Sequence, residues 1–248
     1  MPDTVTLVLE PGRDKAGRPE ACGTLTFQAG QVVGIVGPTG SGKTRLLSDL
    51  ERLSPGDSPT GRKVALSGVP RARIDAGFAV GRISQTMQFF LDLTVAEFVA
   101  MHRDARGTGG DGTPDAVLEA ANGLAGEPMR ADQPLAALSG GQARALMVAD
   151  LVLVADAPVL LIDEIENAGI DRHAALEFLV RRNRLVFLAT HDPLIALRAD
   201  VRLALGEGGI RQVLPTTPGE RDVMGRLDAA DRELRGLRER LRRGETLA

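Results

Sequence analysis

The chain has 248 residues, 43% hydrophobic and 25% charged, with a formal net charge of −3. These values are those of a soluble globular protein, and the absence of a basic excess argues against a nucleic-acid-binding protein. A single cysteine excludes an internal disulfide and suits the cytoplasm, only 3% of the residues are aromatic, and no apolar run reaches the roughly 18 residues that span a bilayer.

Short apolar runs predict buried strands at three places along the chain. Val32–Val36 is β-branched and ends in glycine, and residues 159–162 and 185–188 have the same character. Helical periodicity over residues 116–124 and 143–154 predicts helices between the strands. Strands that alternate with helices indicate a parallel sheet covered by helices.

Two segments stand apart from this sheet domain. Residues 94–156 contain no convincing strand, so we expect a helical lobe inserted between residues 1–93 and 157–215. Residues 216–248 predict an amphipathic helix, because apolar residues recur there with alternating spacings of four and three, at Val223, Leu227, Ala230, Leu234, Leu237 and Leu241. Such a helix either packs on its own domain or associates with a second helix, and the pattern leaves both open.

A glycine-rich loop directly follows the first strand and matches the phosphate-binding pattern G-x-x-x-x-G-K-[ST]. Its glycines let successive backbone N–H groups point at phosphate oxygens, and the helix start adds the positive end of its dipole. Lys43 would neutralise the β- and γ-phosphates, and the Thr44 hydroxyl would be a ligand of Mg²⁺. The loop consists of Gly37, Pro38, Thr39, Gly40, Ser41, Gly42, Lys43 and Thr44.

Two adjacent carboxylates end the apolar strand at residues 159–162. Asp163 is placed to hold the magnesium, and Glu164 to polarise the attacking water or accept its proton. A second anion-accepting helix start follows the pattern Ser-Gly-Gly-Gln at Ser139, Gly140, Gly141 and Gln142. Since a nucleotide has one γ-phosphate, we expect two chains to meet head to tail, each offering this segment to the ATP of the other.

The ordered set of motifs resembles the ATP-binding cassette (ABC) ATPases over residues 24–213. Residues 139–142 match the family signature, Asp163 and Glu164 match the Walker B pair, and Gln85 matches the Q-loop glutamine. His191 matches the switch histidine, and Asp171 is the best match for the D-loop aspartate.

The resemblance implies a P-loop NTPase of the α/β class. Its core would be a mostly parallel sheet with an antiparallel N-terminal β part, to which the helical lobe and the C-terminal helix are added. The ligands would be ATP and Mg²⁺. By the same resemblance, Gln85 would contact Mg²⁺ or the attacking water, His191 would hold the γ-phosphate, and Asp171 would lie at the dimer interface. His102 and His173 match no motif and are expected to be packing or surface residues.

The sequence departs from the family in two places. Residues 9–14 lack the aromatic side chain on which members commonly stack adenine, so Arg13 could take its place, and the choice between ATP and GTP stays open. Residues 165–171 lack the usual proline and are one residue longer than the common D-loop sequence. This change would alter the dimer interface rather than the chemistry.

The leading hypothesis is the ATP-hydrolysing subunit of an ABC transporter, held at the inner face of the membrane by separate permease subunits. Phe89 and Phe90 would suit a groove for a coupling helix of the permease, or else they form core of the helical lobe. The alternatives are a soluble cassette ATPase that remodels a protein or nucleic acid, and a slowly hydrolysing regulatory switch.

Overall fold

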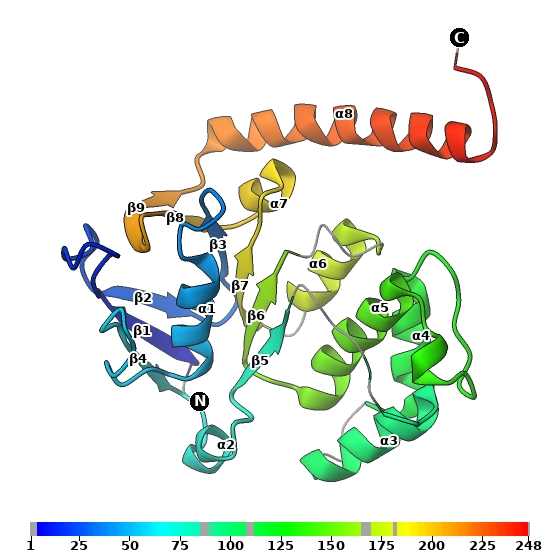
Figure 1. The fold of residues 1–248 in the computed structure, drawn as a ribbon, viewed down its shortest axis with the longest axis horizontal. Helices are drawn as coiled ribbons and strands as arrows, with labels where there is room; N and C mark the ends of the chain where they lie inside the picture. Colours follow the sequence, from blue (N-terminus) through cyan, green and yellow to red (C-terminus); the bar gives the residue numbers. More distant parts are fainter. Residues whose placement is uncertain are drawn as a thin grey trace.

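The central element of this computed structural model is a six-stranded sheet (Figure 1). The structure describes residues 4–84, 89, 91–107, 112–164, 170–180 and 183–247. The strand order is β5-β6-β7-β3-β8-β9, and only β9 pairs antiparallel. The strands are β5 (Val80–Ile83), β6 (Val159–Asp163), β7 (Leu185–Ala189), β3 (Val32–Val36), β8 (Val201–Gly206) and β9 (Gly209–Pro215). The predicted parallel sheet is therefore confirmed, and the three predicted strands agree within one residue.

The central strands β6 and β7 are buried along their whole length, which explains their continuous apolar sequences. Alternate residues of these strands face two different hydrophobic clusters. Leu160 and Leu188 belong to one cluster, and Leu161 and Phe187 to the other. The sheet thus separates two cores.

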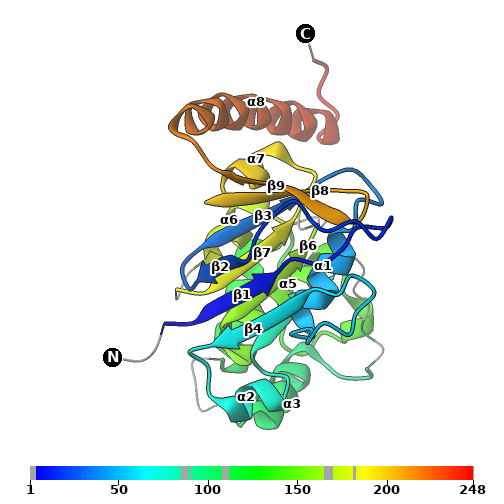
Figure 2. The ribbon, with the colours of Figure 1, turned by 90° about the vertical axis from the view of Figure 1, so that its left-hand side faces the viewer.

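The cluster around Phe187 lies between the sheet, helix α1 (Lys43–Glu51) and a smaller antiparallel sheet (Figures 1 and 2). The smaller sheet has the order β2-β1-β4, with β1 (Thr6–Glu10), β2 (Leu25–Gln28) and β4 (Lys63–Ser67). Its Phe27 meets Phe187 edge to face at a centroid distance of 5.3 Å. The predicted antiparallel N-terminal part is confirmed.

The second cluster unites the other face of the sheet with the helical region. Its helices are α3 (Val95–Arg106), α4 (Pro114–Leu124), the 3₁₀ turn η1 (Leu135–Ala137), α5 (Gly140–Asp150), the π-helical turn η2 (Leu151–Ala155) and α6 (Arg172–Val180). Residues of α3, α4 and α5 share this cluster with Leu160 and Leu188 of the sheet. The helical region therefore packs on the sheet through a shared core, and the predicted boundaries at 94 and 156 remain predictions.

Three further helices complete the described chain. They are α2 (Arg71–Asp75), α7 (Pro193–Leu197) and α8 (Pro218–Arg242), and α8 packs against α7 and then continues past it (Figure 1). No helix in the described ranges is long and apolar enough to cross a membrane.

Candidate functional site

The phosphate-binding loop joins β3 to α1, and its shape requires glycine. Gly37, Gly40 and Gly42 have φ angles of 152°, 78° and 104°. A Cβ on Gly37 would lie 2.5 Å from the carbonyl oxygen of Leu205, and one on Gly42 would lie 2.9 Å from the Cα of Gly208. The loop is therefore held open as a backbone cradle at the start of a helix.

The polar side chains of the loop are arranged for an anion. Lys43 donates from Nζ to the carbonyl of Gly37 at 2.9 Å, and the same Nζ lies 2.9 Å from Nε2 of His191. The buried hydroxyl of Ser41 has no hydrogen-bond partner among the described residues. Thr44 is exposed in the first helical turn. An orphaned hydroxyl, a lysine and a helix start together fit a phosphate group and its metal.

Asp163 ends β6 beside this loop, and its side chain is almost buried. Arg82 of β5 reaches both Glu51, at 2.7 Å, and Asp163, at 3.4 Å. Burial raises the pKa of the Asp163 carboxyl above its ordinary value and the neighbouring Glu164 adds to this, against the opposing charges of Arg82 and Lys43. An oxygen ligand in this position suits a bound cation, which would offset the cost of its negative charge.

Glu164 adopts a left-handed backbone conformation, with φ at 52°. Such strain in a residue other than glycine is often found at functional sites. Its N–H donates to the carbonyl of Ala189, and its carbonyl accepts from Arg144 at 3.2 Å. Oε1 of Glu164 then lies 3.4 Å from Nε2 of His191. The structure therefore brings Lys43, Glu164 and His191 together.

The signature segment lies apart from the phosphate loop of the same chain. Figure 1 shows α1 and α5 on opposite sides of strands β5, β6 and β7. Ser139 and Gly140 are exposed at the start of α5, and a Cβ on Gly140 would meet no atom within 4 Å. This end of α5 is therefore open to a ligand that comes from outside the chain.

Two of the predicted ATP-binding side chains are engaged within the chain. Gln142 forms a capping box with Ser139, and its amide also donates to the carbonyl of Pro128 at 3.3 Å. Asp171 accepts from the backbone N–H groups of His173 and Ala174 and so caps α6. Both side chains therefore shape helix starts in this structure. Gln85 and the D-loop residues 165–169 lie outside the described residues, so their roles remain predictions.

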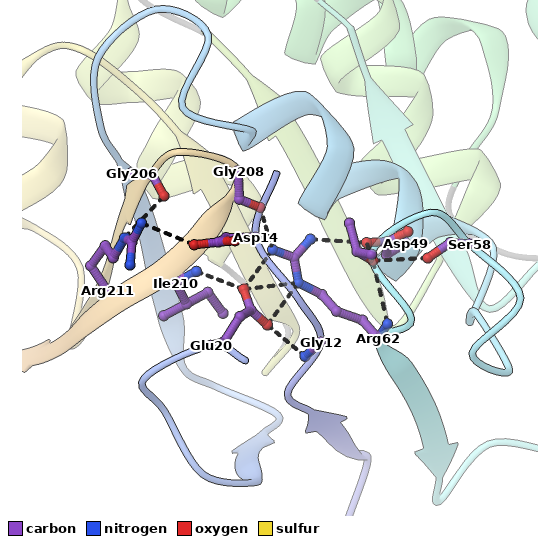
Figure 3. A network of polar contacts seen from close by, with 11 residues as sticks. Gly12, Asp14, Glu20, Asp49, Ser58, Arg62, Gly206, Gly208, Ile210 and Arg211 are labelled. Carbon is purple, nitrogen blue, oxygen red and sulfur yellow. Dashed lines mark hydrogen bonds and ion pairs between the residues drawn. The ribbon is translucent and has the colours of Figure 1, made fainter. Parts of the chain in front are cut away.

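Figure 3 shows a buried charged network centred on Arg62 that no sequence motif predicts. The fully buried Arg62 pairs with Glu20 at 2.6 Å and with Asp49 at 2.9 Å, and it donates to the carbonyl of Gly208. The network thus ties the 12–20 loop, α1, the start of β4 and the β8–β9 turn together. The N–H of Gly208 in turn donates to the carbonyl of Ser41, which holds the phosphate loop.

Glu20 is ionised within this network. Burial alone would raise the pKa of its carboxyl, but Arg62 and the backbone N–H groups of Gly12 and Ile210 outweigh burial and lower that pKa below its ordinary value. No local sequence pattern marks this pair, because Glu20 and Arg62 lie on separate segments and burial is not visible in a single sequence.

An open hollow of about 530 Å³ lies beside the phosphate loop. Lys15, Arg18 and Glu207 line it together with residues 38–41. Lys15 also donates to the carbonyl of Gly40 at 2.8 Å. Arg13 does not line the hollow, and its guanidinium donates to the carbonyl of Gly17. The structure thus gives no support to the predicted stacking by Arg13.

Other predicted residues have structural surroundings. Phe89 packs edge to face on Phe98 at 5.2 Å and joins the helical core, which favours the core interpretation for this residue, whereas Phe90 lies outside the described residues. His102 contacts Asp150 at 2.7 Å and accepts from Arg106. His102 is thus a packing residue.

Comparison with known proteins gives consistent matches. Residues 23–167 match the family described as ABC transporter. An uncharacterized ABC transporter ATP-binding protein of Methanocaldococcus jannaschii is 43% identical over 240 residues, which are 95% of this chain and 92% of that protein. The macrolide export ATP-binding/permease protein MacB of Rhodospirillum rubrum is 34% identical over 75% of this chain but only 30% of its own length. Among solved structures, cbiO1 of Clostridium perfringens, part of the ABC transporter complex cbiONQ, superposes with a TM-score of 0.62 at 21% identity and covers 97% of both chains.

Proposed function

The chain belongs to the ABC transporter family as one of its ATP-binding proteins, and from this premise we propose that it hydrolyses ATP as a head-to-tail dimer. The observation that carries the proposal is the convergence of Lys43, Glu164 and His191 beside an open phosphate cradle. The transporter names of the relatives favour this function over the non-transport alternative.

The side chains divide the reaction between them. Lys43 and the loop N–H groups bind the β- and γ-phosphates. His191, whose Nε2 lies 2.9 Å from Nζ of Lys43, contacts the γ-phosphate beside the lysine. Glu164 accepts a proton from the attacking water, a role that its position 3.4 Å from His191 supports. Thr44 and Asp163 would hold Mg²⁺, which neutralises phosphate charge when bound. Gln85 is proposed to complete this set.

The second half of the site comes from another copy of the chain. The N-terminus of α5, formed by Ser139, Gly140 and Gly141, faces the γ-phosphate of the ATP bound on the other copy. Asp171 lies at the head-to-tail interface between the copies. Gln142 contributes by fixing the helix start rather than by touching the nucleotide, as its capping bonds support. The adenine rests against Lys15 and Arg18 in the hollow beside the loop.

The chain would act at the inner face of a membrane through separate permease subunits. The names of similar proteins support a membrane partner, because cbiO1 is part of the ABC transporter complex cbiONQ and the MacB relative is an ATP-binding/permease protein. Pull-down of the tagged chain from detergent-solubilised membranes should recover a multi-spanning protein, and recovery of soluble partners alone would contradict this assignment.

Two substitutions test the site. Glu164→Gln should lower the rate of ATP hydrolysis about 100-fold or more, the range of general-base catalysis, while ATP stays trapped between two copies, measured as labelled ATP that remains on the protein after gel filtration. Ser139→Arg in the Glu164→Gln background should abolish that trapping and leave equilibrium ATP binding by the single phosphate loop unchanged. Glu119→Arg, on the exposed face of α4, is the matched control and should change neither hydrolysis nor trapping. Normal hydrolysis in the first variant or normal trapping in the second would contradict the proposal.

A further inference from the structure

The C-terminal helix α8 exposes an apolar seam. In the described chain, four of the seven exposed large hydrophobic residues lie between residues 223 and 247. Val223, Leu234 and Leu241, which are 43%, 50% and 56% exposed, all belong to the seam with alternating four- and three-residue spacing. A helix that contains Gly225 and Gly236, at roughly 1 kcal/mol each relative to alanine, needs packing to be stable. The seam therefore lacks a partner for part of its length.

The two halves of α8 differ in what holds them. The first half is fixed to the body by ion pairs of Glu220 with Arg202 and of Asp228 with Arg198, and Asp231 lies 3.9 Å from Nε2 of His173. In the second half, Arg235 pairs with Asp231 and Arg240 pairs with Glu245, so these contacts stay within the tail. Figure 1 shows this second half extending beyond α7.

A groove runs along the first half. Leu227, Ala230 and Leu234 of α8 form one wall, and Pro193 and Leu194 at the start of α7 form the other, around an open volume of about 440 Å³. An apolar helix face of the right length could lie in this groove. The second half of α8, which extends beyond the body, carries such a face. It cannot reach the groove of its own chain, because both halves belong to one continuous helix.

The charges of the two halves are complementary. Residues 218–231 carry four carboxylates and two arginines, whereas residues 232–243 carry six arginines and two glutamates. An antiparallel arrangement of two such helices places the acidic half of each against the basic half of the other. We propose that α8 binds α8 of a second copy of this chain as an antiparallel pair, and that this contact forms without nucleotide.

The seam fixes the register of the pair. Leu234 packs against Leu237 of the partner subunit, and Ala230 packs against the partner's Leu241, with each contact repeated by symmetry. In this register Glu233 faces Arg240 of the partner subunit, and Asp231 faces the partner's Arg238. Both flanks of the seam therefore carry opposite charges, and the small Ala230 leaves room for the large Leu241.

A parallel pair also matches opposite charges, because it places Glu233 against Arg238 of the partner subunit. It leaves the free halves paired with each other and the two grooves unfilled, since each first half stays against its own body. The antiparallel pair fills both grooves with the two free halves. The arrangement of α8 on its own body therefore favours the antiparallel pair.

The first test is association of the full chain without nucleotide, measured by sedimentation velocity. Leu234→Lys and Leu241→Lys should each weaken the association constant at least about tenfold, which corresponds to ~1.4 kcal/mol. Ala229→Lys, on the exposed side of α8 away from the seam, is the matched control and should leave it unchanged. A wild-type chain that stays monomeric, or seam variants that associate like the control, would overturn the proposal.

The second test distinguishes the two orientations and does not depend on loss of folding. Glu233→Lys and Arg240→Glu should each weaken association, and the double variant should restore it, because the antiparallel pair brings these two positions together. In a parallel pair the double variant would be weaker than either single one, and that result would overturn the register. Lys43→Ala should leave the association intact, so that a failure here is distinguishable from a failure of the proposed ATP site.

Discussion

At the scale of single residues, Arg62 explains how the phosphate loop is supported from behind. Its guanidinium is fully buried and contacts two carboxylates as well as the carbonyl of Gly208. A buried ion pair adds little stability compared with apolar packing, but removal of one partner leaves a buried charge uncompensated. The network therefore fixes where four segments meet rather than how tightly the chain folds.

Replacement of Glu20 by Gln should lower the free energy of unfolding by about 3 kcal/mol, because the buried charge of Arg62 loses one of its two carboxylate partners. Glu10→Gln is the control, since Glu10 pairs with Lys63 at an exposed site and at 3.8 Å, and it should cost at most about 1 kcal/mol. Urea unfolding at neutral pH measures both. Equal effects in the two variants would contradict the buried-charge account.

The same variant carries a pH dependence. The pKa of Glu20 is lowered in the folded chain, so its stabilising contribution is present above the unfolded pKa of about 4.3 and is lost as the pH falls through the folded pKa. The difference in unfolding free energy between wild type and Glu20→Gln should therefore shrink as the pH is lowered below about 4. A constant difference would mean that the Glu20 charge is not what stabilises the fold.

The roles of residues that belong to a sequence motif could be predicted from the sequence. The roles of residues that depend on buried contacts between distant segments could not. Lys43, Glu164 and His191 were identified by their place in ordered motifs, and the structure brings them together. Arg82, which contacts the carboxylate of Asp163, and Arg144, which donates to the backbone carbonyl of Glu164, carry no such pattern. Their roles depend on which strand or helix lies next to β6, and a single sequence does not contain that information.

At the scale of elements, helices α3 and α5 begin with the same capping motif, although only the start of α5 has a proposed role in binding ATP. Thr94 starts α3 and Ser139 starts α5, each with a capping box that satisfies backbone N–H groups at the helix start. Both starts carry the capping-box pattern, whereas no sequence pattern marks the change from α to π geometry at Leu151, whose side chain lies against Gly81 of β5. Ser139, the N-cap of α5, would also contact the ATP of the other copy in the proposed head-to-tail dimer.

Thr94→Ala and Ser139→Ala should each lower the free energy of unfolding by about 1 kcal/mol, the usual cost of a lost N-cap. Only Ser139→Ala should also weaken the trapping of ATP between two copies, in a Glu164→Gln background that prevents hydrolysis. Thermal unfolding measures the stability effect, and labelled ATP that remains on the protein after gel filtration measures the trapping. A similar loss of trapping in Thr94→Ala would show that helix stability, and not the serine itself, is responsible.

At the scale of the whole molecule, one sheet supports two cores that share strands. The helical cluster and the α1 cluster contain alternate residues of β6 and β7. Unfolding of either cluster would therefore expose one apolar face of these two strands. The sequence predicted the architecture and an inserted lobe. It did not show that the lobe buries its apolar side against the sheet, because apolar periodicity gives a face but not its partner.

Leu146→Ala, in the helical cluster, and Phe187→Ala, in the α1 cluster, should lower the free energy of unfolding by about 2–5 and 3–5 kcal/mol respectively. In both variants α3–α5 and β1–β4 should unfold in the same transition. Hydrogen exchange followed by mass spectrometry across a urea series reports on each region. Separate transitions, with Leu146→Ala affecting α3–α5 alone, would show that the lobe is an independent unit.

The contact between Lys43 and His191 also shows what ATP must displace. Nε2 of His191 lies 2.9 Å from Nζ of Lys43 and 3.4 Å from Oε1 of Glu164, so one ring nitrogen is shared by the cation and the carboxylate of the site. A γ-phosphate that is bound by both Lys43 and His191 would have to replace their direct contact. The distance between these two side chains therefore reports whether ATP is bound.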